Sequence, residues 1–186
     1  MVGEGDSTHC PSDLIFVLDE SSSVSLENFN LMKDFVSRLV ARLDVDSGNT
    51  RVGAVCFSHY IHTEDAFNMT KHSSLASVQS GISALVYDEG LTHTHLALHH
   101  VRTKMLTAAA GDRPGVPNVV ILLADGQSTN RSKTLVCIHT LDMNAGTFAL
   151  KNVCSGSESS IYGSELTLPG VKIPSNFCSW ERKCRP

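Results

Sequence analysis

Short apolar runs recur along the chain, and each ends at a polar or turn-forming segment. The strongest cover residues 13–19, 51–57 and 118–124, with weaker ones at 59–67 and 147–153. Runs of this length without alternation are typical of strands buried on both faces, as in a parallel sheet. We therefore predict a mostly parallel sheet in which residues 59–67 form a hairpin with the strand before them.

Apolar residues between these strands recur at helical spacing. The pattern predicts helices at residues 26–43, 73–85, 94–109 and 132–143. Strands that alternate with helices over connections of this length are joined by right-handed crossovers. The predicted fold class is α/β, a doubly wound, Rossmann-like sheet that is mostly parallel and flanked by helices.

The pattern stops near the carboxyl end. Residues 154–186 are rich in Ser, Gly and Pro and show no helical periodicity. We therefore predict an amino-terminal extension at residues 1–12, a domain at 13–153 and an atypical cysteine-containing tail at 154–186.

Composition narrows the class of protein. Of the 186 residues, 18% are charged and 41% are hydrophobic, which is ordinary for a globular domain. The formal net charge of -4 provides no basic surface, so no nucleic-acid partner is expected. No apolar run approaches the roughly 20 residues needed to cross a bilayer, so no membrane span is expected.

The six cysteines indicate an oxidising compartment. Cys56 lies in a predicted strand and Cys137 in a predicted helix, where buried thiols are expected. The other four flank the predicted core and are candidate disulfide partners: Cys10, Cys154, Cys178 and Cys184. We expect Cys10 to pair with a tail cysteine. Sequons at Asn68 and Asn130 are candidate N-glycosylation sites and fit a secreted, extracellular protein whose signal peptide is absent from this chain.

The first strand ends in an oxygen-rich segment. Asp19, Ser21 and Ser23 stand at alternate positions, so in an extended segment their side chains point the same way. Open α/β sheets bind ligands at the carboxyl edge, and oxygen donors suit a hard cation such as Mg²⁺. Serines after a strand also cap helices, and Ser25 is the better candidate for that role because it directly precedes the predicted helix.

Five segments together resemble the von Willebrand factor A domain, and more narrowly the A domains of matrilins and of non-fibrillar collagens such as collagen VI. They are residues 13–19, 50–53, 90–94, 113–117 and 123–128, and they run in family order. The family continues after its fifth strand with a helix, a sixth strand and a closing helix. Here the pattern fades after about residue 150, so the resemblance implies an atypical, shortened carboxyl-terminal end.

Carried over by position, the resemblance assigns a metal-ion-dependent adhesion site to Asp19, Ser21, Ser23, Thr92 and Asp125. It implies Mg²⁺, or alternatively Mn²⁺ or Ca²⁺, coordinated in part by an acidic side chain of a protein partner. The partner-binding rim would comprise Glu20, Ser22, Leu91, His93 and Gln127. Collagen or another matrix protein is the expected partner, and Thr94 is expected to cap the helix that follows. Ala124 stands where the family commonly has threonine, which removes a hydroxyl near the site.

Other interpretations use the same residues. A structural matrix-assembly module with a vestigial metal site is one of them. A metal-dependent hydrolase is disfavoured, because haloacid dehalogenase-type enzymes need a second aspartate where Ser21 stands. His95 and His99 are spaced as zinc ligands can be, but Leu96 stands where a catalytic zinc helix has glutamate. We therefore expect a binding module and not an enzyme.

Overall fold

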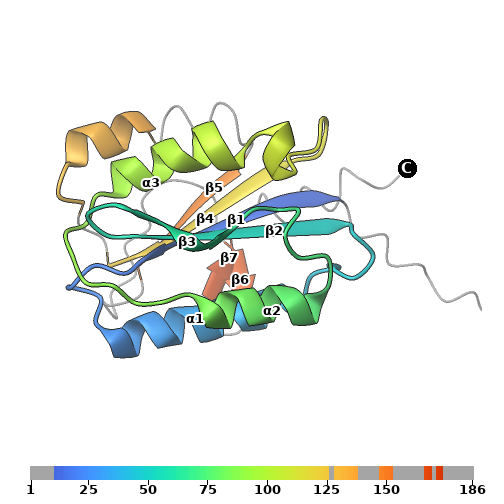
Figure 1. Cartoon of the computed structure of the whole chain (residues 1–186), viewed down its shortest axis with the longest axis horizontal. Coiled ribbons are helices and arrows are strands. Elements are labelled where there is room, and N and C mark those ends of the chain that lie inside the picture. Colours follow the sequence, from blue (N-terminus) through green and yellow to red (C-terminus); the bar gives the residue numbers. More distant parts are fainter. Residues whose placement is uncertain (1–10, 126–127, 138–146, 153–165, 169–170, 174–186) are drawn as a thin grey trace, which may run out of the picture.

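A five-stranded sheet in the order β3-β2-β1-β4-β5 forms the centre of the computed structural model (Figure 1). The strands are β1 (Ser12–Asp19), β2 (Thr50–Phe57), β3 (Ile61–Phe67), β4 (Asn118–Ala124) and β5 (Thr147–Asn152). All pair in parallel except β3, which is antiparallel to β2 as predicted. The structure describes residues 11–125, 128–137, 147–152, 166–168 and 171–173. The last two segments form a short antiparallel pair, β6 (Leu166–Leu168) and β7 (Val171–Ile173).

Helices cover both faces of the sheet (Figure 1). α1 (Leu26–Val40) and α2 (Leu75–Ala84) lie on one face, while α3 (Thr94–His100) and a helical segment at residues 131–137 lie on the other. Alternate side chains of β1 point toward opposite faces of the sheet. Phe16 packs into the core under α1 and α2, whereas Ile15 and Val17 pack with α3. Because both faces are covered, β1 is apolar throughout, and the predicted doubly wound α/β fold is confirmed.

The predicted helix at residues 94–109 is interrupted. α3 ends at His100, and a π-helical turn follows, η1 (Val101–Met105), in which the Leu106 amide donates to the Val101 carbonyl at 2.9 Å. Val101 and Met105 both stay buried across this wider turn. A short 3₁₀ helix, η2 (Ala108–Ala110), then leads to Gly111, whose φ of 100° ends the segment.

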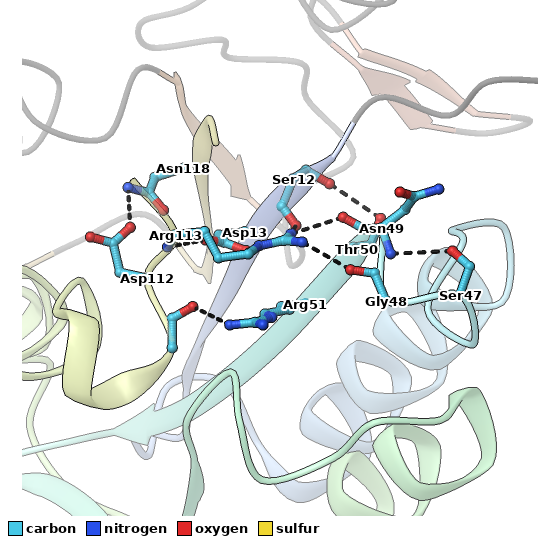
Figure 2. Close-up of polar contacts among 11 residues, drawn as sticks. Ser12, Asp13, Ser47, Gly48, Asn49, Thr50, Arg51, Asp112, Arg113 and Asn118 are labelled. Atoms are coloured by element: carbon cyan, nitrogen blue, oxygen red, sulfur yellow. Dashed lines mark hydrogen bonds and ion pairs between the residues drawn. The ribbon is translucent and has the colours of Figure 1, made fainter. Parts of the chain in front are cut away.

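One arginine holds the amino-terminal edge of the sheet (Figure 2). Arg113 precedes β4, and its backbone amide and Nε each donate to the buried Asp13 carboxylate at 2.8 Å. The guanidinium also donates to the carbonyls of Ser12, Gly48 and Asn49. These contacts join the starts of β1, β2 and β4 at the edge opposite the predicted site.

Candidate functional site

Asp19 ends the central strand β1, between β2 and β4, and is buried. Its Oδ1 accepts a hydrogen bond of 2.9 Å from the Ser21 amide, and the Ser21 and Ser23 hydroxyl oxygens lie 3.1 Å apart. These oxygen-bearing side chains therefore come together at the carboxyl edge of the sheet. They do so through a turn over residues 21–24, in which the Val24 amide donates to the Ser21 carbonyl at 2.9 Å, and not along the extended segment that the sequence predicted. Ser25 is the N-cap of α1, as expected, and accepts a bond from the Asn28 amide at 3.4 Å.

Thr92 and Asp125 reach this edge from other segments. Asp125 directly follows β4, and its charge acts on Asp19. Thr92 is buried before α3, and its amide donates to Thr129 Oγ1 at 3.2 Å. The Thr92 carbonyl accepts from the Thr129 amide at 2.9 Å and from the Ser128 hydroxyl at 3.3 Å. Ser128 and Thr129 thus position Thr92, a role that no local pattern in the sequence indicates.

Two buried carboxylate oxygens at this edge, Asp19 Oδ2 and Asp125 Oδ1, have no hydrogen-bond partner among the described residues. Burial, reinforced by the charge of Asp125, raises the pKa of Asp19 to about 6, although hydrogen bonds from Ser21 and from the Asp125 backbone act in the opposite direction. A buried charge without a partner is costly, and a bound cation would remove that cost. The donors are carboxylates and hydroxyls, which match Mg²⁺ and Ca²⁺. The residues therefore fit a divalent cation.

The predicted rim residues differ in exposure. Leu91 is 57% exposed, Ser22 is exposed and His93 is half-buried. Gln127 lies outside the described residues. Glu20 is 0% exposed, so its predicted place on the rim is wrong. Side chains alternate in direction along an extended segment, and that of Glu20 lies beside β3 instead of on the side that Asp19 faces.

Glu20 is buried beside His62, in an acidic cluster that also includes the partly exposed Asp88. Its Oε1 lies 3.5 Å from His62 Nε2, and the same nitrogen lies 3.1 Å from Asp88 Oδ2. Neither carboxylate oxygen of Glu20 has a hydrogen-bond partner within the part of the chain that the structure describes. Burial, and next the charge of Asp65, raises the pKa of Glu20 to about 8. The cluster therefore connects the end of β1 to the edge strand and does not present a carboxylate to a partner.

The turn between β2 and β3 lies next to the candidate site, a contact that the sequence did not indicate. The His93 amide donates to the Ser58 carbonyl at 2.8 Å, and His93 Nδ1 lies 3.0 Å from the His59 carbonyl oxygen. The Ser22 amide donates to the Gly90 carbonyl at 3.0 Å. A Cβ at Gly90 would collide with the His59 ring, so glycine lets this loop lie against the turn.

The expectation that Thr94 caps α3 is wrong. His93 occupies the N-cap without a side-chain hydrogen bond, and Thr94 is a buried first helical residue. His95 and His99 lie on the same helix, His95 half-buried and His99 exposed. Across the described ranges, no group of three or more His, Cys, Asp or Glu side chains is arranged to hold a metal ion. The zinc interpretation therefore gains no support from α3.

The candidate disulfide cysteines lie outside the described residues: Cys10, Cys154, Cys178 and Cys184. Cys56 is a buried free thiol in β2, as expected, and its burial raises its pKa. Cys137 is partly buried, with its Sγ 3.6 Å from the His95 carbonyl oxygen. In the described segments, no helix has the length and apolar character needed to cross a membrane.

Several longer proteins contain a region similar to this chain. The von Willebrand factor A domain-containing protein 1 of Bos taurus is 42% identical over 118 residues, which covers 63% of this chain and 28% of that protein. Matrilin-4 of Homo sapiens is 40% identical over 119 residues, covering 62% of this chain and 19% of matrilin-4. The collagen alpha-4(VI) chain of Mus musculus is 38% identical over 122 residues, covering 64% of this chain and 5% of the collagen. This chain therefore spans less than a third of each relative's length.

Two solved structures share the fold. Proximal thread matrix protein 1 from the mussel byssus, in a form with a zinc-occupied MIDAS motif, is 28% identical with a TM-score of 0.67 over 76% of this chain and 37% of that one. Manganese-loaded Plasmodium vivax TRAP protein is 17% identical with a TM-score of 0.67 over 95% of this chain and 64% of that one. At this lower identity, the likeness to TRAP bears on the fold alone.

The model of the von Willebrand factor type A domain family matches residues 13–150. The matched region begins in β1, extends into β5 and contains every candidate metal ligand. The resemblance to matrilins and collagen VI that the sequence motifs indicate is confirmed by the similarity to matrilin-4 and to the collagen alpha-4(VI) chain. The chain belongs to the von Willebrand factor type A domain family.

Proposed function

We propose that this domain is an extracellular matrix-binding module that attaches to a protein partner through a divalent cation. One observation carries the proposal: buried carboxylate oxygens of Asp19 and Asp125 have no hydrogen-bond partner among the described residues. Such oxygens weaken a fold unless a charged ligand compensates them. A site that leaves them uncompensated within the chain is therefore suited to a cation.

The proposed ligands are Asp19 and Asp125 together with the hydroxyls of Ser21, Ser23 and Thr92. Mg²⁺, or alternatively Mn²⁺ or Ca²⁺, would supply a Lewis-acidic position that the carboxylate of a partner can take. The chain itself holds the cation-binding oxygens in place before a cation binds, because the Ser21 amide orients the Asp19 carboxylate. The neutral hydroxyls limit the negative charge of the site, so a further carboxylate is not repelled.

The proposed partner is collagen or another matrix protein that presents an acidic side chain. Support comes from relatives that are a collagen chain and a matrilin, and from a similar structure of a byssus matrix protein. Ser22, Leu91, His93 and Gln127 would line the rim. An extracellular setting, a domain bounded at residues 13–153 and a disulfide between Cys10 and a tail cysteine belong to the same proposal.

Calorimetric titration of MgCl₂ into the metal-stripped full chain tests the site. We expect saturable binding that is lost in Asp19→Ala and retained in Asp34→Ala, which removes an exposed carboxylate on α1 as a matched control. Binding to immobilised collagen, with and without chelator, then tests the partner. If a folded protein shows no saturable magnesium binding, the better function is a structural assembly module with a vestigial site.

A further inference from the structure

The two N-glycosylation sequons lie at different ends of the sheet. Asn68 follows β3, which runs antiparallel to β2 and therefore heads toward the amino-terminal edge. Asn130 directly precedes the helical segment at residues 131–137, on the loop that follows β4. An N-linked glycan is bulky and solvated, so its position decides which surface it covers.

The Asn68 sequon lies beside the segment that leads to Arg113. The Met69 amide donates to the Ala110 carbonyl at 3.0 Å, and the Thr70 methyl group lies next to Gly111. The Gly111 carbonyl in turn accepts a 3.0 Å bond from Arg51 on β2, within the contacts drawn in Figure 2. This sequon therefore belongs to the edge of the sheet opposite the candidate metal site.

The side chain of Asn68 is accessible for the attachment of a glycan. Asn68 and Thr70 are exposed, while Met69 between them is buried and anchors the turn. Asn68 Oδ1 accepts bonds from the Thr70 amide at 3.1 Å and from the Thr70 hydroxyl at 2.8 Å. The carboxamide is thus held through its oxygen, and its nitrogen, the atom that carries a glycan, remains available at the surface.

Asn130 is in a different position. Its side chain is half-buried, and its Oδ1 accepts a 3.1 Å bond from the Lys133 amide in the first turn of the helical segment. Its neighbour Thr129 holds the backbone of Thr92 through bonds at 2.9 and 3.2 Å. A glycan on Asn130 would therefore lie at the rim of the candidate metal site and obstruct a partner.

We propose that Asn68 is the N-glycosylation site of this domain and that Asn130 is left unmodified, so that the glycan covers the edge opposite the candidate metal site. The inference rests on the extracellular setting of the proposed function. The Nδ2 atom attacks the anomeric carbon of a lipid-linked oligosaccharide diphosphate. A C–N bond forms, the C–O bond to the diphosphate breaks, the diphosphate leaves with the electron pair, and the nitrogen loses one proton.

The test is the mass of the full chain secreted from mammalian cells behind a cleavable leader, measured before and after enzymatic removal of N-glycans. Peptide mapping identifies the modified asparagine. We expect one glycan, lost in Asn68→Gln and retained in Asn130→Gln. Thr70→Val and Thr70→Ser form a matched pair, because Thr70→Val keeps the shape without the hydroxyl that the sequon requires and Thr70→Ser keeps the hydroxyl. Thr70→Val should lose the glycan and Thr70→Ser should keep it.

An unmodified secreted chain, or a glycan at Asn130 with or without one at Asn68, would overturn the assignment. Variants that are not secreted are measured from the cell lysate, because the glycan is attached before secretion. The result is independent of the metal site: if the glycosylated protein binds no magnesium, the proposed function fails while the mass still decides the glycan's position.

Discussion

Asp13 and Asp19 lie at the two ends of β1, both buried, yet they meet opposite conditions. Both Asp13 oxygens accept bonds of 2.8 Å from Arg113, whose guanidinium also binds three carbonyl oxygens at the same edge (Figure 2). At the other end, Asp19 Oδ2 has no hydrogen-bond partner in the described parts of the chain, and neither oxygen of Glu20 has one.

The two ends of β1 therefore show two different roles of a buried carboxylate. At the amino-terminal edge, Asp13 is paired with a charge of opposite sign, so the pair can hold the strands together without a ligand. At the carboxyl edge, the chain bears the desolvation cost of Asp19 and compensates it only in part, through hydrogen bonds and without a charge of opposite sign. Strained or under-satisfied groups that the rest of the fold maintains are typical of functional sites. The amino-terminal edge is therefore compensated within the chain, and the carboxyl edge is where we propose that a cation binds.

The largest expected effect is at the amino-terminal edge. Arg113→Ala leaves the Asp13 carboxylate buried without its counter-charge, which costs about 3–5 kcal/mol of unfolding free energy. Arg51→Ala is the control at the same edge, because it removes one bond to the Gly111 carbonyl and should cost about 1–2 kcal/mol. Urea unfolding measures both. Equal costs for the two variants would refute a special role for the Asp13–Arg113 pair.

The same substitution at the two ends of β1 should have opposite signs. In metal-free protein near neutral pH, Asp19→Asn removes a charge whose pKa is raised from 3.8 to about 6, and should stabilise the fold by roughly 2–3 kcal/mol. Asp13→Asn removes the partner of Arg113 and should destabilise it by a few kcal/mol. Chemical denaturation after chelation measures both changes. Destabilisation by Asp19→Asn would contradict an uncompensated charge at the carboxyl edge.

Metal-free stability should also depend on pH through the carboxyl edge. Because the folded-state pKa of Asp19 is raised, the folded protein binds more protons than the unfolded chain between pH 3.8 and about 6. Stability is therefore full below this window and falls as pH rises through it. Glu20, with its pKa raised to about 8, should extend the decline toward that pH. Unfolding free energies of the wild type and of Asp19→Asn are measured across this pH range. In the variant, the fall in stability between pH 3.8 and about 6 should disappear. An unchanged pH profile would contradict this explanation.

A smaller effect tests how Thr92 is positioned. Thr129→Val removes the hydroxyl that accepts a bond from the Thr92 amide, and should weaken magnesium binding by about tenfold, as loss of outer contacts at metal sites does. Thr129→Ser keeps the hydroxyl and should bind as the wild type does. Thr129→Val leaves the amide of buried Thr92 without this acceptor and should cost about 1–3 kcal/mol of unfolding free energy, whereas Thr129→Ser should change it little. Calorimetric titration of both variants tests this, and equal affinities would remove Thr129 from the site.

The smallest effect concerns backbone strain at the carboxyl edge. Among the described residues other than glycine, Ser25 alone has a positive φ, of 67°. Ser25→Gly relieves this conformation and loses a long, exposed cap bond of 3.4 Å, so a net stabilisation of about 0.5–1 kcal/mol is expected. Ser25→Ala keeps the strain, loses the cap and should destabilise by about 1 kcal/mol. Thermal unfolding that places both variants on the same side of wild type would exclude strain at this position.

Much of the fold could be predicted from local patterns. The strands at residues 13–19, 51–57 and 118–124 are predicted to within one residue, because strands covered on both faces are apolar throughout. The helix at 94–109 was predicted too long, because its apolar periodicity continues through Val101 and Met105, where the structure has a π-helical turn. The antiparallel pair of β6 and β7 could not be predicted from the sequence pattern, since each strand has only three residues.

The candidate site likewise has features that the local sequence predicts and features that only long-range contacts establish. Asp19, Ser21 and Ser23 are close in the sequence, and the structure brings these side chains together, but through a turn instead of the predicted extended segment. Glu20 was misplaced on the rim because sequence proximity to Asp19 does not reveal the buried cluster with His62. The bonds from Ser128 and Thr129 to Thr92 span more than thirty residues, and local spacing carries no information about such contacts.

The sequence by itself determined the family, the alternation of strands and helices, and the oxygen-bearing residues at the end of β1, because these depend on residue type and short-range periodicity. Only the tertiary structure decided which carboxylates are compensated. Asp13 and Asp19 are the same residue type on the same strand, but Arg113, far away in the chain, reaches one of them, and the other is left with an oxygen that no described residue satisfies. Whether a buried charge stabilises the fold or awaits a ligand is set by such long-range neighbours, which the order of residues along β1 does not contain.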